Sequence, residues 1–305
     1  MVSFCQEVET VELRVLQYFL AVAREQSISA AAESLHLSQP TLSTQLRQLE
    51  DELGKQLLIR GAKGSRRVTL TEEGVILRKR AEEILALVHR AEDEIARSDE
   101  NIAGDVYIGA GEADIVRLFA EAAKLMQDRH PDVHYHITSG NAEHVLEQLD
   151  KGLIDFGIVF GGVDSQKYEF ISLPVRDSWG VLMRRDSPLA GKDAIRPEDL
   201  WDKPLIISRQ RDADPQLSRW LRRELYSLNV VATYNLVFNA SLLVDEGVGY
   251  ALCLDRLINT SGSGMCFRPL EPALDAPACV CWKKYQVQSK AALAFLAQLR
   301  ALINA

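Results

Sequence analysis

The chain has 305 residues, more than one typical hydrophobic core holds, so we expect two or three domains. Hydrophobic residues make up 47% and charged residues 26%, which is ordinary for a globular protein and excludes a disordered or fibrous chain. The formal net charge of −8 excludes a protein that is basic throughout, so nucleic-acid binding would require a local positive face.

The sequence also indicates a compartment. No uninterrupted apolar run is long enough to span a bilayer, and the first twenty residues lack the basic segment of a signal peptide. The five cysteines are few, odd in number and without the spacing of a disulfide framework, which is typical of a reducing environment. These features together predict a cytoplasmic protein without membrane contact.

Three short helices are predicted near the N-terminus. Residues 11–23 form the first, and a tight polar turn separates the second from the third. The third begins at Ser38-Gln39-Pro40, where a proline in the first turn costs no hydrogen bond. The residues expected to face inward are Leu13, Leu16, Phe19, Leu20 and Ala23, then Ile28, Ala31, Ala32 and Leu35, then Leu42, Leu46, Leu49 and Leu53.

The outer face of the third helix is polar near its start. It carries Gln39, Thr41, Ser43, Thr44 and Arg47, whose side chains can reach base edges and phosphates. A solvated helix face would have the same composition, but the preceding short helix and the proline start favour a helix-turn-helix that places this helix in the major groove. Ser29 and Pro40 complete the set of predicted DNA contacts on these two helices.

A basic, β-rich stretch follows, from Gln56 to Thr71. Between residues 54 and 68 the chain has no acid and carries Lys55, Arg60, Lys63, Arg66 and Arg67. Two glycines break this stretch, which predicts a hairpin wing. An ordinary basic hairpin would fit as well, but so many cations in an acidic chain favour phosphate contact by Arg60, Lys63, Arg66 and Arg67.

A long helix begins after Thr71, with two glutamates in its first turn, where acids are favourable. Its apolar residues alternate at spacings of four and three, which is the coiled-coil pattern, and the remaining face is mostly charged. The predicted dimerisation residues are Leu77, Ala81, Ile84, Val88, Ala91 and Ile95. A helix with such a seam needs a partner to bury it.

Strands and helices alternate after residue 101, which predicts an α/β fold with a parallel sheet covered by helices. Strands are expected at 106–110, 133–138 and 156–160, and helices at 113–127 and 142–149. After Pro174 the pattern is less regular. There we expect strands at 179–183, 205–208, 230–237, 249–253 and 278–282, and helices at 216–225, 241–246 and 289–303.

Polar and glycine residues follow several of these strands. The carboxyl ends of strands are where open α/β sheets bind ligands, so we expect an effector to contact Gly111, Glu112, Ser139, Asn141, Phe160, Ser208 and Arg209. Helix capping would explain Ser139 and Asn141 equally well. An arginine in such a site favours an anionic ligand, whereas Glu112 would suit an amine, so a zwitterion also fits.

Two further groups of residues favour packing over chemistry. His134 and His136 share one strand face, but a metal site needs three or four converging ligands, and no helical histidine pair accompanies them. Cys279 and Cys281 also share a strand face, where free cysteine commonly acts as a small buried hydrophobe rather than a redox switch. We therefore predict no metal site and no cofactor.

Taken together, these residues resemble the LysR-type transcriptional regulators over nearly the whole chain. The resemblance rests on Ser29-x-Ala31-Ala32-x-x-Leu35-x-x-Ser38-Gln39-Pro40-x-Leu42-Ser43, then Leu49-Glu50, Leu53-Gly54, Leu57, Arg60 and Leu70-Thr71-x-x-Gly74. Softer matches follow at Gly152-x-x-Asp155-Phe156-Gly157-Ile158 and Gly247-Val248-Gly249-Tyr250-Ala251. The chain departs from the family at Leu58, where phenylalanine is usual, in a longer segment before Leu70, and at Leu254-Asp255, which replaces a usual proline.

The resemblance implies three parts. They are a winged helix-turn-helix DNA-binding domain at residues 11–70, a linker and dimerisation helix at 71–100, and a two-lobed effector domain at 102–305 similar to periplasmic binding proteins. In such folds the chain crosses twice between lobes. Lobe I would therefore hold residues 102–171 and 271–305, and lobe II residues 172–270. Tetramers built from dimers are also implied.

The function that follows is sequence-specific DNA binding and transcription regulation, modulated by a small molecule between the lobes. The predicted partners are double-stranded DNA, a small-molecule effector, further copies of the chain and the transcription machinery. A solute-binding protein would share the lobes but not the N-terminal module, and an export signal would favour it. An enzyme using the cleft would turn over its ligand, but no nucleophile or phosphate-binding motif is visible, so we predict that the chain is not an enzyme.

Overall fold

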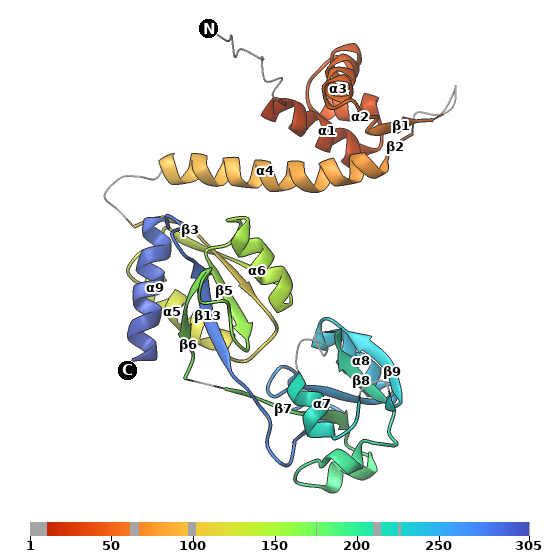
Figure 1. Cartoon of the computed structure of the whole chain (residues 1–305), viewed down its shortest axis with the longest axis vertical. Helices are drawn as coiled ribbons and strands as arrows, with labels where there is room; N and C mark the ends of the chain where they lie inside the picture. The colour runs from red at the N-terminus through yellow and green to blue at the C-terminus, as the bar shows by residue number, and fades with distance from the viewer. Residues whose placement is uncertain are drawn as a thin grey trace. The chain divides into compact units, whose positions relative to one another are not determined.

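The computed structural model describes residues 11–61, 67–96, 102–174, 176–209, 215–224 and 227–304. The chain divides into two compact units, of which the first ends at Ala96 and the second begins at Arg97 (Figure 1). None of the helices in the described ranges combines the length and apolar character that a membrane crossing needs.

The first unit is a helical domain with a small wing. Its elements are α1 (Leu13–Glu25), α2 (Ile28–Ser34), α3 (Gln39–Leu53), the antiparallel strands β1 (Leu58–Arg60) and β2 (Val68–Leu70), and α4 (Glu72–Ala96). Its buried core contains Phe19, Val22, Ala31, Leu42, Leu46, Leu49 and Val68. The three predicted helices and the predicted hairpin are therefore all present.

Two side chains that we expected in this core lie outside it. Leu13 is 44% exposed, because the buried stripe of α1 runs through Val15, Phe19 and Val22 instead. Leu53 is 40% exposed, because α3 ends there and Gly54 turns the chain away in a left-handed conformation, with φ of 62°. The inner face of α3 consequently ends with Leu49.

The second unit contains two sheets, which form lobes I and II. In lobe I the strand order is β4 (Val133–Ser139), β3 (Gly104–Ala110), β5 (Phe156–Phe160), β13 (Ala278–Lys283) and β6 (Tyr168–Ser172). The first three are parallel, whereas β13 is antiparallel to both of its neighbours. The sheet is thus mixed rather than fully parallel as predicted, because β13 runs opposite to the other four strands.

Helices cover both faces of the lobe I sheet. Helices α5 (Val116–Gln127) and α9 (Lys290–Ile303) pack on one face, where Phe119 and Phe295 meet alternate residues of β3, β5 and β13. Helix α6 (Ala142–Asp150) packs on the other face, with Val145 and Leu149 against Val159. Because side chains alternate along each strand, consecutive residues point to opposite faces of the sheet and pack in two different cores.

Lobe II has the same layered plan. Its sheet has the order β11 (Met265–Pro269), β7 (Asp177–Arg184), β10 (Tyr250–Leu254), β8 (Leu205–Ser208) and β9 (Val230–Tyr234), and the short β12 (Asp275–Ala276) pairs with β7. Helix α7 (Pro215–Leu221) and the 3₁₀ turns η1 (Pro188–Gly191) and η2 (Pro197–Asp199) lie on one face. Helix α8 (Val237–Asp245) packs on the other.

The chain passes between the lobes twice, from β6 to β7 and from β12 to β13 (Figure 1). Near these crossings Trp179 packs against the cores of both lobes. One expected strand, residues 230–237, ends at Tyr234, and Val237 already begins α8. Strands β6, β11 and β12 were not predicted.

Candidate functional site

The start of α3 is fixed by its own sequence. The Ser38 hydroxyl caps the helix by accepting a hydrogen bond from the Thr41 backbone N–H at 3.3 Å. Pro40 follows in the first turn, and Leu42 and Leu46 anchor the helix in the core. The opposite face is therefore held in a defined direction and presents its side chains to the solvent.

The predicted DNA contacts divide into bonded and unbonded side chains. Gln39, Pro40, Thr41, Thr44 and Arg47 are exposed, while Ser29 and Ser43 are partly buried. The Ser29 hydroxyl donates to Gln39 Oε1 at 3.2 Å, and the Thr44 hydroxyl donates to the Pro40 carbonyl at 2.9 Å. Within the described parts of the chain Arg47 has no hydrogen-bond or ion-pair partner, so its guanidinium is available.

Glu50 ties the wing to α3, a role that composition alone did not indicate. Its Oε1 accepts the backbone N–H groups of Leu57 and Leu58 at 2.8 and 3.0 Å. Its Oε2 pairs with Arg60 Nη2 at 3.2 Å. The carboxylate thus positions the first wing strand and its arginine together, and Leu49-Glu50 was the available sequence signal.

The other wing residues are only partly described. Arg60 keeps 36% of its side chain exposed despite the pairing with Glu50, and Arg67 is exposed at the start of the returning strand. Lys63 and Arg66 lie outside the described residues. The described wing therefore offers two arginines to a phosphate backbone.

Thr71 connects the wing to the long helix α4. Its hydroxyl donates to the Gln56 carbonyl at 2.7 Å and accepts the Gly74 N–H at 2.9 Å. A Cβ at Gly74 would lie 2.2 Å from the Leu57 carbonyl oxygen, so only glycine allows this approach. The motif Leu70-Thr71-x-x-Gly74 is thereby explained by helix capping and by backbone contact.

The predicted seam of α4 is divided between two uses. Ala81 is fully buried within the chain, where it packs with Leu85 against Leu16 of α1, and Leu77 lies beside them. We therefore remove Leu77 and Ala81 from the surface expected to meet a second copy. Val88 is partly buried, whereas Ile84, Leu87, Ala91 and Ile95 are exposed.

In lobe I, the predicted effector contacts gather at one edge of the sheet. The ends of β3, β4 and β5 are adjacent, since Ala110 is in register with both Ser139 and Ile158. A Cβ at Gly111 would lie 3.9 Å from Phe160 Cε2. Asn141 caps α6 by accepting the His144 N–H at 2.9 Å, so the capping explanation holds for this residue.

In lobe II, the predicted contacts lie at the end of β8. Ser208 is in register with Tyr234 of β9, and Arg209 follows it with an exposed side chain. The Tyr234 hydroxyl donates to the Leu252 carbonyl at 2.7 Å. Burial raises the pKa of Tyr234 well above its usual value, and the Cys253 thiol and the Glu112 carboxylate add to this effect.

A direct hydrogen bond joins these two groups of strand ends. Glu112, which follows β3 of lobe I, accepts the backbone N–H of Val237 in lobe II at 2.5 Å. Val237 begins α8, three residues after Tyr234. The structure thus brings Glu112 next to the strand ends of lobe II, as the prediction for an interlobe site requires.

A second acid at this junction was not predicted. Asp177 begins β7, is 5% exposed, and accepts backbone N–H groups from Asp114 and Ile115. Burial raises the pKa of its carboxyl, against the lowering effect of those N–H groups. Its Oδ2 has no hydrogen-bond partner in the described portions of the chain. Sequence reasoning missed it because its partners are backbone atoms of a distant loop.

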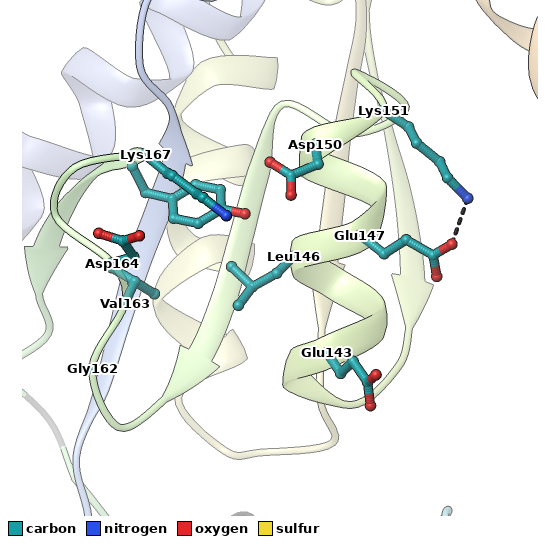
Figure 2. Close-up of a pocket in the computed structure, with 10 residues that line it drawn as sticks. Glu143, Leu146, Glu147, Asp150, Lys151, Gly162, Val163, Asp164 and Lys167 are labelled. Carbon is teal, nitrogen blue, oxygen red and sulfur yellow. Dashed lines mark hydrogen bonds and ion pairs between the residues drawn. The ribbon is translucent and has the colours of Figure 1, made fainter.

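A groove of about 500 Å³ lies elsewhere on lobe I, between α6 and residues 162–168 (Figure 2). Its polar groups are largely paired. Lys151 bonds Glu147 at 2.5 Å. Burial, with the nearby Asp150 carboxylate, raises the pKa of Tyr168 to about 12. None of the predicted effector contacts lines this groove.

The cysteines and histidines have packing roles. Burial raises the pKa of Cys279 to about 11 and of Cys281 to about 12, so both stay as unreactive thiols at neutral pH. The His136 ring stacks on Tyr107 with centroids 4.7 Å apart and lies 2.9 Å from Asp105 Oδ1. In the described ranges no three His, Cys, Asp or Glu side chains converge on a metal site.

Comparisons with known proteins find transcriptional regulators that contain a helix-turn-helix domain and a substrate-binding domain. The chain is 36% identical to the HTH-type transcriptional regulator BsdA of Bacillus subtilis (strain 168) over 204 residues, which are 65% of this chain and 67% of that protein. It is 30% identical to the DNA-binding transcriptional dual regulator OxyR of Escherichia coli (strain K12) over 196 residues, 64% of this chain and 63% of that protein.

A solved structure of CbnR, a LysR family transcriptional regulator, resembles this structure with a TM-score of 0.76 over 96% of this chain and 99% of that one. At 20% sequence identity this likeness shows the fold alone. Residues 13–75 match the bacterial regulatory helix-turn-helix protein family of lysR type, and residues 99–303 match the LysR substrate binding domain. Because these two matches cover most of the sequence, the chain belongs to the LysR family of transcriptional regulators.

Proposed function

We propose that this regulator reads operator DNA with the exposed face of α3 and changes its effect on transcription when a small molecule binds between lobes I and II. The observation that carries the proposal is the available Arg47 on a capped, well-anchored helix beside an arginine-bearing wing. A helix presented in this way suits insertion into the major groove, while wing cations suit the phosphates.

Arg47→Ala is expected to weaken operator binding by about 1–3 kcal/mol, since one base contact is lost. The measurement is fluorescence anisotropy with operator and scrambled duplexes at several salt concentrations. Arg67→Ala should instead weaken binding to both duplexes and reduce the salt dependence, because it removes a phosphate contact. Operator affinity unchanged in Arg47→Ala would rule out the proposed reading helix.

A matched control lies on the same helix. Gln48 is exposed one residue beyond Arg47 and bonds Gln45 at 3.0 Å, so Gln48→Ala changes a polar side chain of similar length outside the predicted set. We expect it to bind both duplexes as the unmodified protein does. Equal losses in the two variants would indicate damage to the helix rather than a lost contact.

For the effector, we propose an anionic or zwitterionic small molecule at the strand ends that carry Gly111, Glu112, Ser139, Asn141, Phe160, Ser208 and Arg209. Arg209 would bind a carboxylate or phosphate by its two-pronged guanidinium. Arg209→Ala should abolish the ligand response of a reporter gene while operator binding persists. Full ligand affinity of the Arg209→Ala protein in calorimetry would show that the pocket is elsewhere.

The assembly and the setting complete the proposal. We infer a homodimer joined through α4, and a tetramer of two such dimers, acting in the cytoplasm with the transcription machinery. A solved structure holds full-length CbnR in complex with its target DNA, which is a precedent in that protein. We infer regulation without turnover, and unchanged ligand after prolonged incubation with the purified protein is the expected result.

Thiol chemistry is the strongest rival mode of sensing, because several relatives are hydrogen peroxide-inducible genes activators. The four cysteines of the effector unit are buried. Burial raises the pKa of Cys253 to about 12 as well, so Cys253, Cys279 and Cys281 lack the thiolate character that peroxide sensing needs. A bound small molecule therefore fits this chain better than oxidation.

A further inference from the structure

We propose that Glu112 is an interlobe latch, a carboxylate of lobe I that holds the resting effector unit closed by capping helix α8 of lobe II. Its Oε2 accepts the Val237 N–H at 2.5 Å, although the two residues are 125 positions apart and belong to different lobes. The regulatory meaning of the latch rests on the proposed function, whereas the contact itself does not.

Helix α8 cannot satisfy its first turn by itself. Its N-cap residue is Leu236, whose side chain has no acceptor, and no side-chain cap of its own is formed. Helices α2, α3, α6 and α9 are each capped by a serine or asparagine of their own segment. Because the N-terminal N–H groups of a helix need acceptors and favour negative charge, Glu112 supplies what Leu236 lacks.

The loop that carries Glu112 is held in place by other contacts. Asp177, at the start of β7, accepts the backbone N–H groups of Ile115 and Asp114. Asp114 Oδ2 also lies 3.5 Å from Arg256 Nη1 of lobe II, and only 12% of its side chain is exposed. The direction of Glu112 is therefore set by the fold rather than by a freely rotating loop.

Residues at and after the end of β10 add apolar contact between the lobes. Leu254 is buried in the core of lobe I although it ends strand β10 of lobe II, and Leu257 packs against both lobes. Separation of the lobes would expose these side chains and leave α8 uncapped. The closed arrangement is consequently the resting state, and an effector acts by the difference of its affinity for the closed and open arrangements.

Two variants test the latch from opposite sides. Glu112→Ala removes the acceptor at an exposed position. Val237→Pro removes the donor, and proline is tolerated at the first position of a helix when the preceding residue is extended, as Leu236 is, with φ of −119° and ψ of 126°. Glu143→Ala is the matched control, an exposed glutamate in the first turn of α6 within lobe I.

The measurement is amide hydrogen exchange of the full-length protein without ligand or DNA, followed by mass spectrometry. Glu112→Ala should speed exchange about five- to tenfold in the first turn of α8 and also in residues 111–115 and 254–257. Val237→Pro should have the same effect at the two distant segments, and the double variant should be no faster than either single one. Glu143→Ala should leave all three segments unchanged.

Two outcomes would overturn the latch. Faster exchange confined to α8 would show that Glu112 only caps the helix, and unchanged exchange would show that the contact has no influence on the lobes. If Val237→Pro does not fold, Glu112→Ala still decides, since its side chain is at the surface. Neither outcome touches the proposed function, which is tested separately by ligand titration and operator binding.

Discussion

Ile84→Glu is expected to break the assembled protein into smaller species and to reduce operator affinity by about 10²–10⁴-fold, which is the gain that two linked DNA-binding modules ordinarily provide. Ile84 is 41% exposed in the single chain, and on the same helix Leu87 and Ile95 are 39% and 75% exposed. Because Ile84, Leu87, Ala91 and Ile95 follow one another at spacings of three and four residues, they share a helix face that a second copy can cover.

The glutamate would place a charge without a partner in that buried seam. Analytical ultracentrifugation measures the species present, and anisotropy with an operator carrying two half-sites measures the affinity. Ala86→Glu is the matched control, since Ala86 is exposed and lies roughly 200° further around the helix. Assembly that survives Ile84→Glu but not Ala86→Glu would place the seam on another face.

Phe295→Ala should lower the free energy of unfolding of the effector unit by about 3–5 kcal/mol. The ring is fully buried at the centre of lobe I, with its centroid 5.8 Å from Phe119, 5.5 Å from Tyr135 and 5.8 Å from Phe156. Its removal forfeits the apolar burial and leaves a cavity that three large side chains cannot easily fill. Such a loss is a large share of the stability of an ordinary domain.

Urea denaturation followed by tryptophan fluorescence isolates this effect, because all four tryptophans lie in the second unit. Leu293→Ala is the control, since Leu293 lies on the same helix and is 54% exposed. We expect its midpoint to stay within the error of the unmodified protein. A similar loss in both variants would mean that α9 is not anchored through Phe295.

The DNA-binding unit was predictable from the sequence because its signals are local. The serine cap, the proline in the first turn and the leucines of α3 each act within one helical segment. The role of Glu50 was less visible, because its contacts to Leu57 and Arg60 depend on the fold of the wing. Within α1 to α3, periodicity gave the wrong inner face only at Leu13 and Leu53, both at helix ends.

In the effector unit, the central strands of lobe I were predictable and the edges were not. Residues 156–160 form a strand, as predicted, and all but Phe160 are buried. Helix α8 is apolar on nearly every side, from Val237 and Phe238 to Leu242 and Val244. Its hydrophobic residues therefore show no clear helical period, and Val237 was assigned to a strand. Strand β11 is an edge strand that pairs only with β7 and ends in a proline. Its burial does not alternate along the strand, so the sequence pattern did not indicate it.

The candidate effector site was predictable only as a set of strand ends. That Gly111 and Phe160 lie together follows from the parallel order of β3 and β5. The bond from Glu112 to the backbone of Val237 and the contacts of Asp177 join segments that are far apart in the sequence. Almost every residue has a backbone N–H, so the residue type does not show which N–H group a distant carboxylate will bind. A single sequence therefore does not reveal such partners.

The two crossings between the lobes also govern the order in which the protein can be assembled during its synthesis. Lobe II is built from one continuous segment, from β7 to β12, so all its strands are synthesised before β13. The lobe I sheet is incomplete until β13 is synthesised, because β13 lies between β5 and β6. Phe295, which packs in the lobe I core, is synthesised after β13. Synthesis therefore begins with lobe I and also ends with lobe I. A chain that stops before α9 would contain a complete lobe II and an incomplete lobe I.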